Sequence, residues 1–289
     1  MPSRKGRTRP LGLVGLVVVA LFVVVGVFAP LLAPHEPDVR SGLPFERPSR
    51  QHLLGTDDVG YDLLSEVLWG TRVSLLVGVS AALVAVAVGG LVGLVAGQRR
   101  GTLDAVLMRG VDLSLALPFV PLLVVLAAYL GQGLRNEVLA LSLLLWAYPA
   151  RVVRSQVLSV RQRLYVTAAR SYGARPPYLL RRHLLPAVAP LLVAEFVRAV
   201  TVAILLEATL GFLGLGDPLQ RSWGSIVYFA TARGAFLTGA WVWWIVPPGL
   251  CVAVVAAGFA FLGVWVEERV DARLARRAAG TGFVLHPAA

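Results

Sequence analysis

Long apolar runs alternate with polar segments along this chain of 289 residues. A helix that crosses a bilayer needs about 20 consecutive, mainly apolar residues. Runs of that length lie at about residues 11–32, 73–96, 103–130, 137–157, 187–214 and 239–266. The first is too long for the roughly 7–15-residue core of a signal peptide, so we expect an uncleaved helix. The pattern therefore predicts an all-α, polytopic membrane protein with six transmembrane helices.

Prolines and glycines modify these predicted spans. Pro118 and Pro121 are expected to kink the third span, and Pro247 and Pro248 the sixth, because proline lacks an N–H donor and clashes with the preceding turn. The second span is rich in glycine and alanine, which lets neighbouring helices approach closely. Residues 215–238 are polar and contain several glycines. We expect them to form a re-entrant or surface helix on the outer side.

A long polar stretch separates the first two spans. Its motif residues are Gly55, Thr56, Asp57, Asp58 and Asp62. Thr56 or Asp57 is the expected N-cap of a helix that runs through Leu68, because short polar side chains accept hydrogen bonds from the first helical N–H groups. The acidic cluster could also suggest a metal site, but capping is the simpler interpretation. We therefore predict no metal site here.

Composition and charge agree with a membrane protein. Hydrophobic residues make up 57% of the chain and the mean hydropathy is +0.74, whereas soluble domains are roughly 45–50% apolar. The net charge of +11 comes from arginines in blocks between apolar runs, which argues against a nucleic-acid surface. Since cytoplasmic loops have excess Lys and Arg, we predict that both termini and the connection between the fourth and fifth spans are cytoplasmic.

Residues that enzymes and metal sites require are scarce or scattered. Lys5 is the only lysine, and it does not stand in a phosphate-binding Gly-Lys-Ser/Thr sequence. The chain therefore has no site of this kind for ATP, so we expect neither enzyme activity nor a cofactor on it; if it takes part in an ATP-driven process, hydrolysis must occur on another polypeptide. Cys251 is the only cysteine, which excludes an intrachain disulfide. The histidines are too widely spaced for a recognisable ligand set: His35, His52, His183 and His286.

Ionisable residues interrupt the apolar fifth span. An Arg or Asp at the bilayer centre costs about 2.5–3.5 kcal/mol, so such residues face the bundle or an aqueous path. Glu195 and Arg198 are three residues apart and can pair on one helix face near mid-membrane. A structural ion pair and a role in the substrate pathway are both open interpretations. Glu207 is expected near the outer surface.

The connection between the fourth and fifth spans, residues 165–186, is polar and basic. Good helix formers end at Gly173, where a left-handed C-cap can close a helix. Two consecutive prolines then prevent an uninterrupted helix. Ala168 and Ala169 are small enough to let a partner approach closely. We therefore expect a short coupling helix that docks into a groove on another protein.

This connection resembles the EAA loop of bacterial ABC importer permeases. Thr167, Ala168 and Ala169 occupy the Glu-Ala-Ala positions, with Thr167 in place of the usual glutamate. Gly173 follows at the family spacing, and the pattern closes with His183, Leu184, Leu185 and Pro186. The resemblance implies a docking site for an ATPase made of Tyr165, Thr167, Ala168, Ala169, Gly173, Leu185 and Pro186.

Two further motifs resemble the same class. Residues 55–62 are similar to the segment after the first helix of dipeptide, oligopeptide and nickel permeases, with Tyr61 in place of an arginine common there. Residues 206–216, which include Glu207, are similar to a second family motif, with Gly211 in place of serine. With the EAA-like loop, they identify the chain as similar to the C-type permease subunit of the peptide/nickel class.

The resemblance implies an importer of the bacterial inner membrane. It would combine two unlike permeases, two ATP-binding subunits and an extracytoplasmic substrate-binding protein, and this chain would form half of the pathway. Di- or oligopeptides are the expected substrate, and nickel is the alternative. An ion-coupled secondary transporter is an alternative of another class, which the lack of an evident internal repeat disfavours. We expect a first helix and outer segment (1–72), a permease domain (73–273) and a cytoplasmic tail (274–289).

Overall fold

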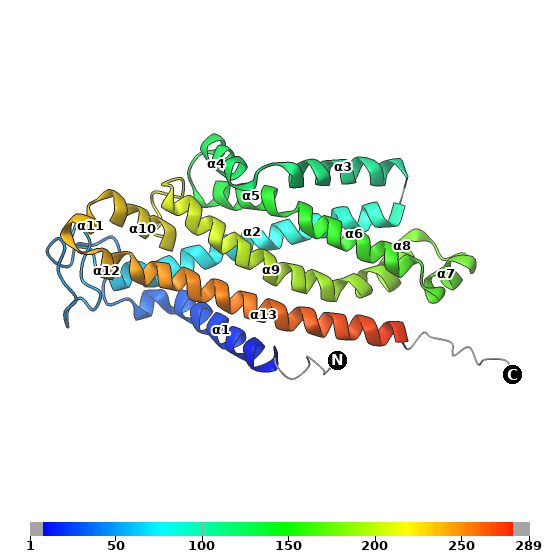
Figure 1. Cartoon of the computed structure of the whole chain (residues 1–289), viewed down its shortest axis with the longest axis horizontal. Helices are drawn as coiled ribbons and strands as arrows, with labels where there is room; N and C mark the ends of the chain where they lie inside the picture. The colour runs from blue at the N-terminus through cyan, green and yellow to red at the C-terminus, as the bar shows by residue number, and fades with distance from the viewer. Residues whose placement is uncertain (1–7, 100, 280–289) are drawn as a thin grey trace.

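The computed structural model describes residues 8–99 and 101–279. Within these ranges the regular structure is helical, and the β-type pairing is an isolated bridge between Thr56 and Asp62. The elements lie roughly along one long axis (Figure 1). They are α1 (Thr8–Leu32), α2 (Leu63–Arg99), α3 (Thr102–Ala116), α4 (Phe119–Leu130), α5 (Leu134–Leu145), α6 (Ala147–Arg161), α7 (Leu164–Ser171), α8 (Pro176–Leu179), the π-helical turn η2 (Leu180–Leu184), α9 (Leu185–Phe212), α10 (Trp223–Ala232), α11 (Ala235–Thr238), α12 (Trp241–Trp244) and α13 (Val246–Ala279).

Four stretches of helix are long and apolar enough to cross a membrane. They are Pro10–Leu32, Leu63–Arg99, Pro176–Phe212 and Trp241–Val270. Two bent helix pairs, α3 with α4 and α5 with α6, pass the same test together, which gives up to six spans if each pair counts as one. The all-α polytopic class predicted from the apolar runs is therefore confirmed, and two of the runs form broken spans.

The break in the third span is sharper than a proline kink. Leu117 ends α3 in an extended conformation (φ −74°, ψ 141°), because the residue before a proline is disfavoured in a helix. Pro118 then precedes α4, which turns away from α3 by 97°. In the sixth span, Pro247 and Pro248 lie in the first turn of α13, where the missing N–H donors would have had no partner. They start a helix instead of bending one.

The start of α2 also differs from expectation. The helix begins at Leu63 and continues without interruption to Arg99, so no separate short helix precedes the second span. Neither Thr56 nor Asp57 is its N-cap. That role belongs to Asp62, whose Oδ2 accepts hydrogen bonds from the Ser65 backbone N–H (2.9 Å) and the Ser65 hydroxyl (2.7 Å). The predicted cap was wrong because the chain first makes a compact loop that uses Thr56 and Asp57.

A row of glycines on α2 brings it into backbone contact with α6. Gly89, Gly93 and Gly97 are four residues apart and therefore share one face. A Cβ atom on Gly89 would lie 2.2 Å from the Trp146 carbonyl oxygen, and one on Gly93 would lie 2.4 Å from that of Ala150. Small residues in this spacing let helices approach closely inside a membrane, where apolar burial gives no preference for a neighbour over lipid. The expected close packing of this span is confirmed.

A second backbone contact joins α9 to α10. A Cβ on Gly211 would lie 2.8 Å from the Ser225 nitrogen, and one on Gly224 would lie 2.4 Å from the Ala208 carbonyl oxygen. The start of α10 is closed by a capping box between Ser222 and Ser225. The glycine that replaces the family serine at position 211 therefore lies where two helices cross.

We expect Gly93→Ala to lower the melting temperature of the purified chain. Its methyl group meets the backbone of α6, and overpacking of this kind typically costs about 1–3 kcal/mol. Gly110→Ala on α3 is the matched control, because its Cβ would meet nothing within 4 Å and alanine is the better helix former. Thermal unfolding of both variants in the same detergent measures the difference. Equal melting temperatures would contradict the close contact.

Candidate coupling segment and membrane pathway

The EAA-like residues form a helix that ends at a glycine, as predicted. After α7, the Gly173 N–H donates to the Arg170 carbonyl (2.9 Å) and the Ala174 N–H donates to that of Ala169 (3.1 Å). These two bonds define a Schellman motif, which needs a left-handed residue at its turn. Gly173 has a φ of +82° and meets this requirement. The chain thus reverses immediately after the small alanines.

The turn leads directly into a continuous helical path of 37 residues, Pro176–Phe212. Pro176 and Pro177 occupy the first turn of α8, where proline is well tolerated. The π-helical turn η2 then joins α8 to α9 without a loop, and the Leu185 N–H bonds the Leu180 carbonyl across it. Single π-turns of this kind are frequent at functional sites. Displacement of α8 can therefore be transmitted along the axis of α9.

Apolar side chains fix this segment to the rest of the bundle. Val166, Leu179 and Leu184 are buried in a cluster with Leu94 of α2 and Val157 of α6. Polar contacts add to this base: the Gln98 amide donates to the Pro176 carbonyl (2.8 Å), and the Arg161 guanidinium donates to the carbonyls of Gly97 (2.6 Å) and Gln98 (2.5 Å). The segment is therefore attached firmly to α2 and α6 on one side.

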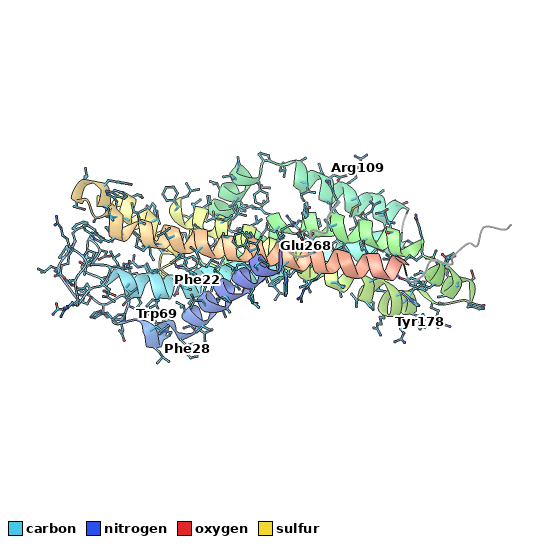
Figure 2. The ribbon with its side chains drawn as sticks, turned by 60° about the horizontal axis from the view of Figure 1, so that its bottom comes forward. Phe22, Phe28, Trp69, Arg109, Tyr178 and Glu268 are labelled. Atoms are coloured by element: carbon cyan, nitrogen blue, oxygen red, sulfur yellow. The ribbon has the colours of Figure 1, made fainter. Side chains whose placement is uncertain are left out.

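Its other side is open to solvent. Thr167, Ala168, Gly173, Leu185 and Pro186 are exposed, whereas Tyr165 and Ala169 are half-buried. Large apolar side chains are exposed beside them: Tyr172 (92%), Leu164 (73%) and Tyr178 (54%). Figure 2 shows Tyr178 near this end of the molecule. Most of the residues singled out from the sequence are therefore exposed, beside large apolar side chains and several exposed arginines of the same segment.

Glu195 and Arg198 form the ion pair that their spacing indicates. The Arg198 Nη2 and Nε lie 3.0 Å and 3.1 Å from Glu195 Oε2. The guanidinium also stacks on the ring of Tyr148, 3.6 Å from its centroid. Arg198 and Tyr148 line a small pocket with Phe119, Leu145 and other side chains of α3, α5 and α9. The arginine therefore faces the interior side of the bundle, where a charge is least costly.

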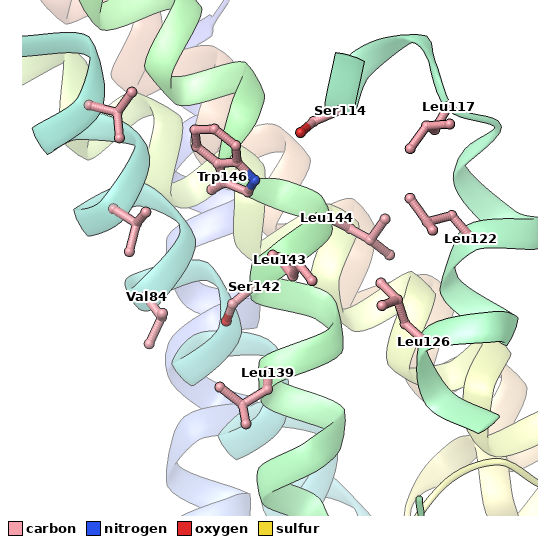
Figure 3. Close-up of a pocket in the computed structure, with 12 residues that line it drawn as sticks. Val84, Ser114, Leu117, Leu122, Leu126, Leu139, Ser142, Leu143, Leu144 and Trp146 are labelled. Carbon is pink, nitrogen blue, oxygen red and sulfur yellow. The ribbon is translucent and has the colours of Figure 1, made fainter. Parts of the chain in front are cut away.

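An apolar hollow of about 620 Å³ lies next to this pocket and shares Leu144 with it. Side chains of α2, α4 and α5 surround it, together with residues around the α3–α4 break (Figure 3). Leu122 and Leu126 of α4 face Leu143 and Leu144 of α5 across the space (Figure 3). The 97° turn after α3 thus opens a cavity that a straight span would fill.

Glu207 lines neither the Arg198 pocket nor the apolar hollow. It is fully buried at the outer end of α9, where Ser74 of α2 and Ser222 lie beside it. Glu137 of α5 is also buried, and its position at the edge of an apolar run gave no sign of this in the sequence. The structure therefore separates Glu207 from the Glu195–Arg198 pair, and the three do not form one site.

The motif of residues 55–62 stabilises the loop between α1 and α2. The Asp57 Oδ1 accepts the backbone N–H groups of Val59, Gly60 and Tyr61 at 2.8–2.9 Å. Burial raises the pKa of Asp57, and these N–H groups oppose the increase. Asp58 pairs with Arg233 of the segment after α10 (3.0 Å). These acidic residues have structural partners in the loop.

The remaining residues of the motif also stabilise this loop. Gly55 has a φ of +75°, and a Cβ there would lie 2.3 Å from the Glu46 carbonyl oxygen. The Thr56 hydroxyl donates to the Leu43 carbonyl (2.5 Å) and accepts from the Glu46 N–H (2.9 Å). Asp62 closes the loop as the cap of α2. The motif therefore specifies local structure at each of its positions.

Two interhelical ion pairs were not predicted. Arg154 of α6 makes a bidentate contact with Asp104 of α3, at 2.6 Å and 2.8 Å. Arg151, one turn earlier, pairs with Asp112 (2.5 Å). Each joins residues at least 39 positions apart, so spacing within one helix gives no indication of them. They attach α3, which has few buried side chains, to α6.

Two family models match this sequence. Residues 89–276 match "binding-protein-dependent transport system inner membrane component", and residues 4–55 match "N-terminal TM domain of oligopeptide transport permease C". Three bacterial relatives resemble most of the chain. It is 36% identical to a probable D,D-dipeptide transport system permease protein of Escherichia coli (strain K12), covering 91% of this chain and 87% of the relative.

The other two relatives are similar in extent. A dipeptide transport system permease protein of Bacillus subtilis (strain 168) is 33% identical, over 94% of this chain and 85% of the relative. A putative peptide transport system permease protein of Brucella suis is 38% identical, over 90% and 87%. Among solved structures, an inward-facing MetNI methionine ABC transporter matches 72% of this chain and 96% of its own with a TM-score of 0.56. At 20% identity it supports the fold alone.

We expect Glu195→Gln to destabilise the chain by about 1–3 kcal/mol, because Arg198 loses its charged partner in a partly buried position. The double variant Glu195→Gln/Arg198→Gln should recover part of this loss, since no unpaired charge remains. Arg151→Gln is the control: its ion pair is more than half exposed on both sides and contributes about 0–1 kcal/mol. Thermal unfolding in detergent compares them, and strict additivity would exclude a coupled pair.

Proposed function

The chain belongs to the inner-membrane components of binding-protein-dependent transport systems, and we propose that it is one of two unlike permeases of an ATP-driven importer of di- or oligopeptides. Its membrane location and its role as a permease follow from the family. The substrate, the pairing with a second permease and ATP hydrolysis on separate subunits are the proposed parts.

The relatives favour peptides over nickel as the substrate. The three bacterial relatives are named as dipeptide or peptide transport permeases, and each is matched over at least 85% of its length. The half-buried Cys251 and the dispersed methionines and histidines provide no row of soft ligands along the spans. A hollow lined largely by leucine and valine suits the side chains of a peptide better than a metal ion.

The observation that supports a coupling role best is the continuous helix from α8 through η2 to α9. We propose that an ATP-binding subunit docks on the exposed face formed by Thr167, Ala168 and Gly173. From Pro176 to Arg198 the helical path is roughly 33 Å long at 1.5 Å per residue. Closure of the ATPases would push α8 and so move the Arg198 pocket without an intervening flexible loop.

The other half of the pathway would come from the second permease. The hollow beside Leu122 and Leu143 and the adjacent Arg198 pocket both lie next to α3 and α4, which have few buried side chains. We propose that the second subunit faces this side, so that the two chains enclose the substrate between them. A substrate-binding protein would deliver peptide at the opposite end from α7, where the outer loop and α11 lie (Figure 1).

The orientation follows from the same arrangement. Arg170 of α7, Arg175 before α8, and Arg181 and Arg182 of η2 lie at the end of the molecule that we assign to the cytoplasm, because positively charged segments remain on that side. The motif loop of residues 55–62 would then lie outside. ATP binding would turn the spans outward to accept peptide, and ATP hydrolysis would return them.

ATP-dependent peptide uptake tests the function. We expect the chain, co-expressed with its partner subunits and reconstituted in lipid vesicles, to support ATP-dependent uptake of labelled di- or tripeptides when the binding protein is present. A vesicle preparation without ATP is the control. Uptake of nickel with no uptake of peptides would contradict the substrate, and transport that needs an ion gradient but no ATPase would contradict the class.

A substitution at Gly173, where the chain turns after α7, tests the proposed docking and the transmission of motion through α8, η2 and α9. Gly173→Trp should leave membrane insertion intact but abolish peptide-stimulated ATP hydrolysis, because the indole projects from the docking face. Gly101→Trp is a matched control: both glycines have a positive φ (+82° and +76°), and a Cβ on either would meet no atom within 4 Å. Both variants therefore place a side chain at a positive φ, a backbone conformation that favours glycine. Normal coupling in the Gly173 variant would exclude the docking role.

A further inference from the structure

Three potential metal ligands from separate segments meet in the outer loop. His35 follows the end of α1, His52 lies in the loop, and Asp62 precedes α2. One ligand atom from each lies within 4.8 Å of the other two. The His52 Nδ1 is 3.0 Å from Asp62 Oδ1, and the His35 Nδ1 is 3.9 Å from Asp62 Oδ2. Two imidazoles and a carboxylate are a ligand set that Zn²⁺ accepts.

The spacing is close to that of a bound metal. Tetrahedral zinc with bonds of about 2.0–2.2 Å places neighbouring ligand atoms about 3.3–3.6 Å apart. The 3.0 Å contact between His52 and Asp62 is a hydrogen bond, and a cation would displace its proton and widen it slightly. The 3.9 Å separation between His35 and Asp62 would need to shorten slightly. The ring centroids of His35 and His52 are 5.1 Å apart, so the imidazoles already converge.

One of the candidate ligand atoms is a buried histidine nitrogen that lacks a hydrogen bond. The His35 Nδ1 is buried from solvent and has no hydrogen-bond partner within the described ranges. A buried polar atom without a partner is unfavourable, and such atoms often mark an absent water or ion. Asp62 offers a carboxylate oxygen 3.9 Å away, too far for a hydrogen bond. A cation between the two groups would give the His35 Nδ1 the partner that it lacks.

The surrounding groups orient the ligands as in known metal sites. The Ser65 N–H and hydroxyl both donate to Asp62 Oδ2, and the same hydroxyl accepts from the His35 backbone N–H (3.1 Å). When His52 binds through Nδ1, its Nε2–H can donate to Glu46 once the Glu46 Oε2, now 3.8 Å away, moves within hydrogen-bond distance. A carboxylate in that position fixes the ring of a metal-bound histidine and raises its basicity.

We propose that His35, His52 and Asp62 bind one divalent cation of the Zn²⁺ type and that it staples the outer end of α1 to the start of α2. The His52 and Asp62 side chains are 4% and 1% exposed, whereas that of His35 is 35% exposed. A cation could therefore enter from the solvent beside His35, whereas the side formed by His52 and Asp62 is closed to solvent. The site is structural and distinct from the transported substrate, because its ligands include the buried helix cap of α2.

Zinc binding by the chain itself tests this proposal. The full-length chain is purified with an affinity tag that contains no histidine, treated with a chelator, and titrated with Zn²⁺. We expect one tightly bound Zn²⁺ per chain by elemental analysis and a higher melting temperature when it is bound. Co²⁺ in place of Zn²⁺ should give the visible absorption of a tetrahedral or five-coordinate site. A wild-type chain that retains no zinc after gel filtration overturns the proposal.

Variants separate the site from other histidines. His35→Gln should abolish retention of zinc yet keep the metal-free melting temperature, because the side chain is partly exposed and its Nδ1 makes no hydrogen bond in the described part of the chain. His183→Gln removes a histidine that lies between Tyr165 and Tyr178 at the other end and should bind zinc as the wild type does. Glu46→Gln should weaken binding by about 10–100-fold. Unchanged zinc affinity in His35→Gln would refute the assignment even if the wild type binds zinc.

Discussion

The contact between α2 and α6 supports much of the rest of the structure. Inside a membrane, apolar burial does not distinguish a neighbouring helix from lipid, so close packing has to hold the helices together. Gly89, Gly93 and Gly97 supply that closeness because their missing side chains admit the backbone of α6. At the end of this contact, Arg161 caps the last carbonyls of α2. The packed pair of α2 and α6 then positions α3 through Arg154, and it positions the coupling segment through buried valines and leucines.

The packed pair of α2 and α6 shows how movement of the exposed α7–α8 segment could reach distant parts of the chain. The lever formed by α8, η2 and α9 rests on α2 and α6 at one end, and Gly211 fixes it against α10 at the other. Between these two contacts, Arg198 stacks on Tyr148 beside the pocket and the hollow. In the proposed mechanism, motion of α8 would reach the Glu195–Arg198 pair along this continuous helical path.

Periodic and local features of the sequence predicted the fold well. The apolar runs indicated the spans because bilayer thickness sets their length, and Gly173 indicated the end of α7 because the Schellman turn requires a positive φ. Features that depend on contacts between residues far apart in the sequence were not predictable. Pro118 indicated a kink in the third span but not that α4 turns by 97°. Asp62 became the cap of α2 only because Thr56 and Asp57 serve the loop, and His35 meets His52 only after both loops fold. Wide sequence spacing led us to expect no metal ligands there, although folding removes that spacing.

The two ends of the molecule differ in a way that suits import. At the outer end, ion pairs join distant segments: Arg221 lies 3.3 Å from Glu66 of α2, and Arg233 lies 3.0 Å from Asp58. With Trp223 buried between α1 and α2, these contacts make a compact cap. At the other end, Tyr172 and Leu164 project from a segment attached on one side only. In the proposed importer, the closely packed end would face the substrate-binding protein, and the open face of α7 would face the ATP-binding subunit.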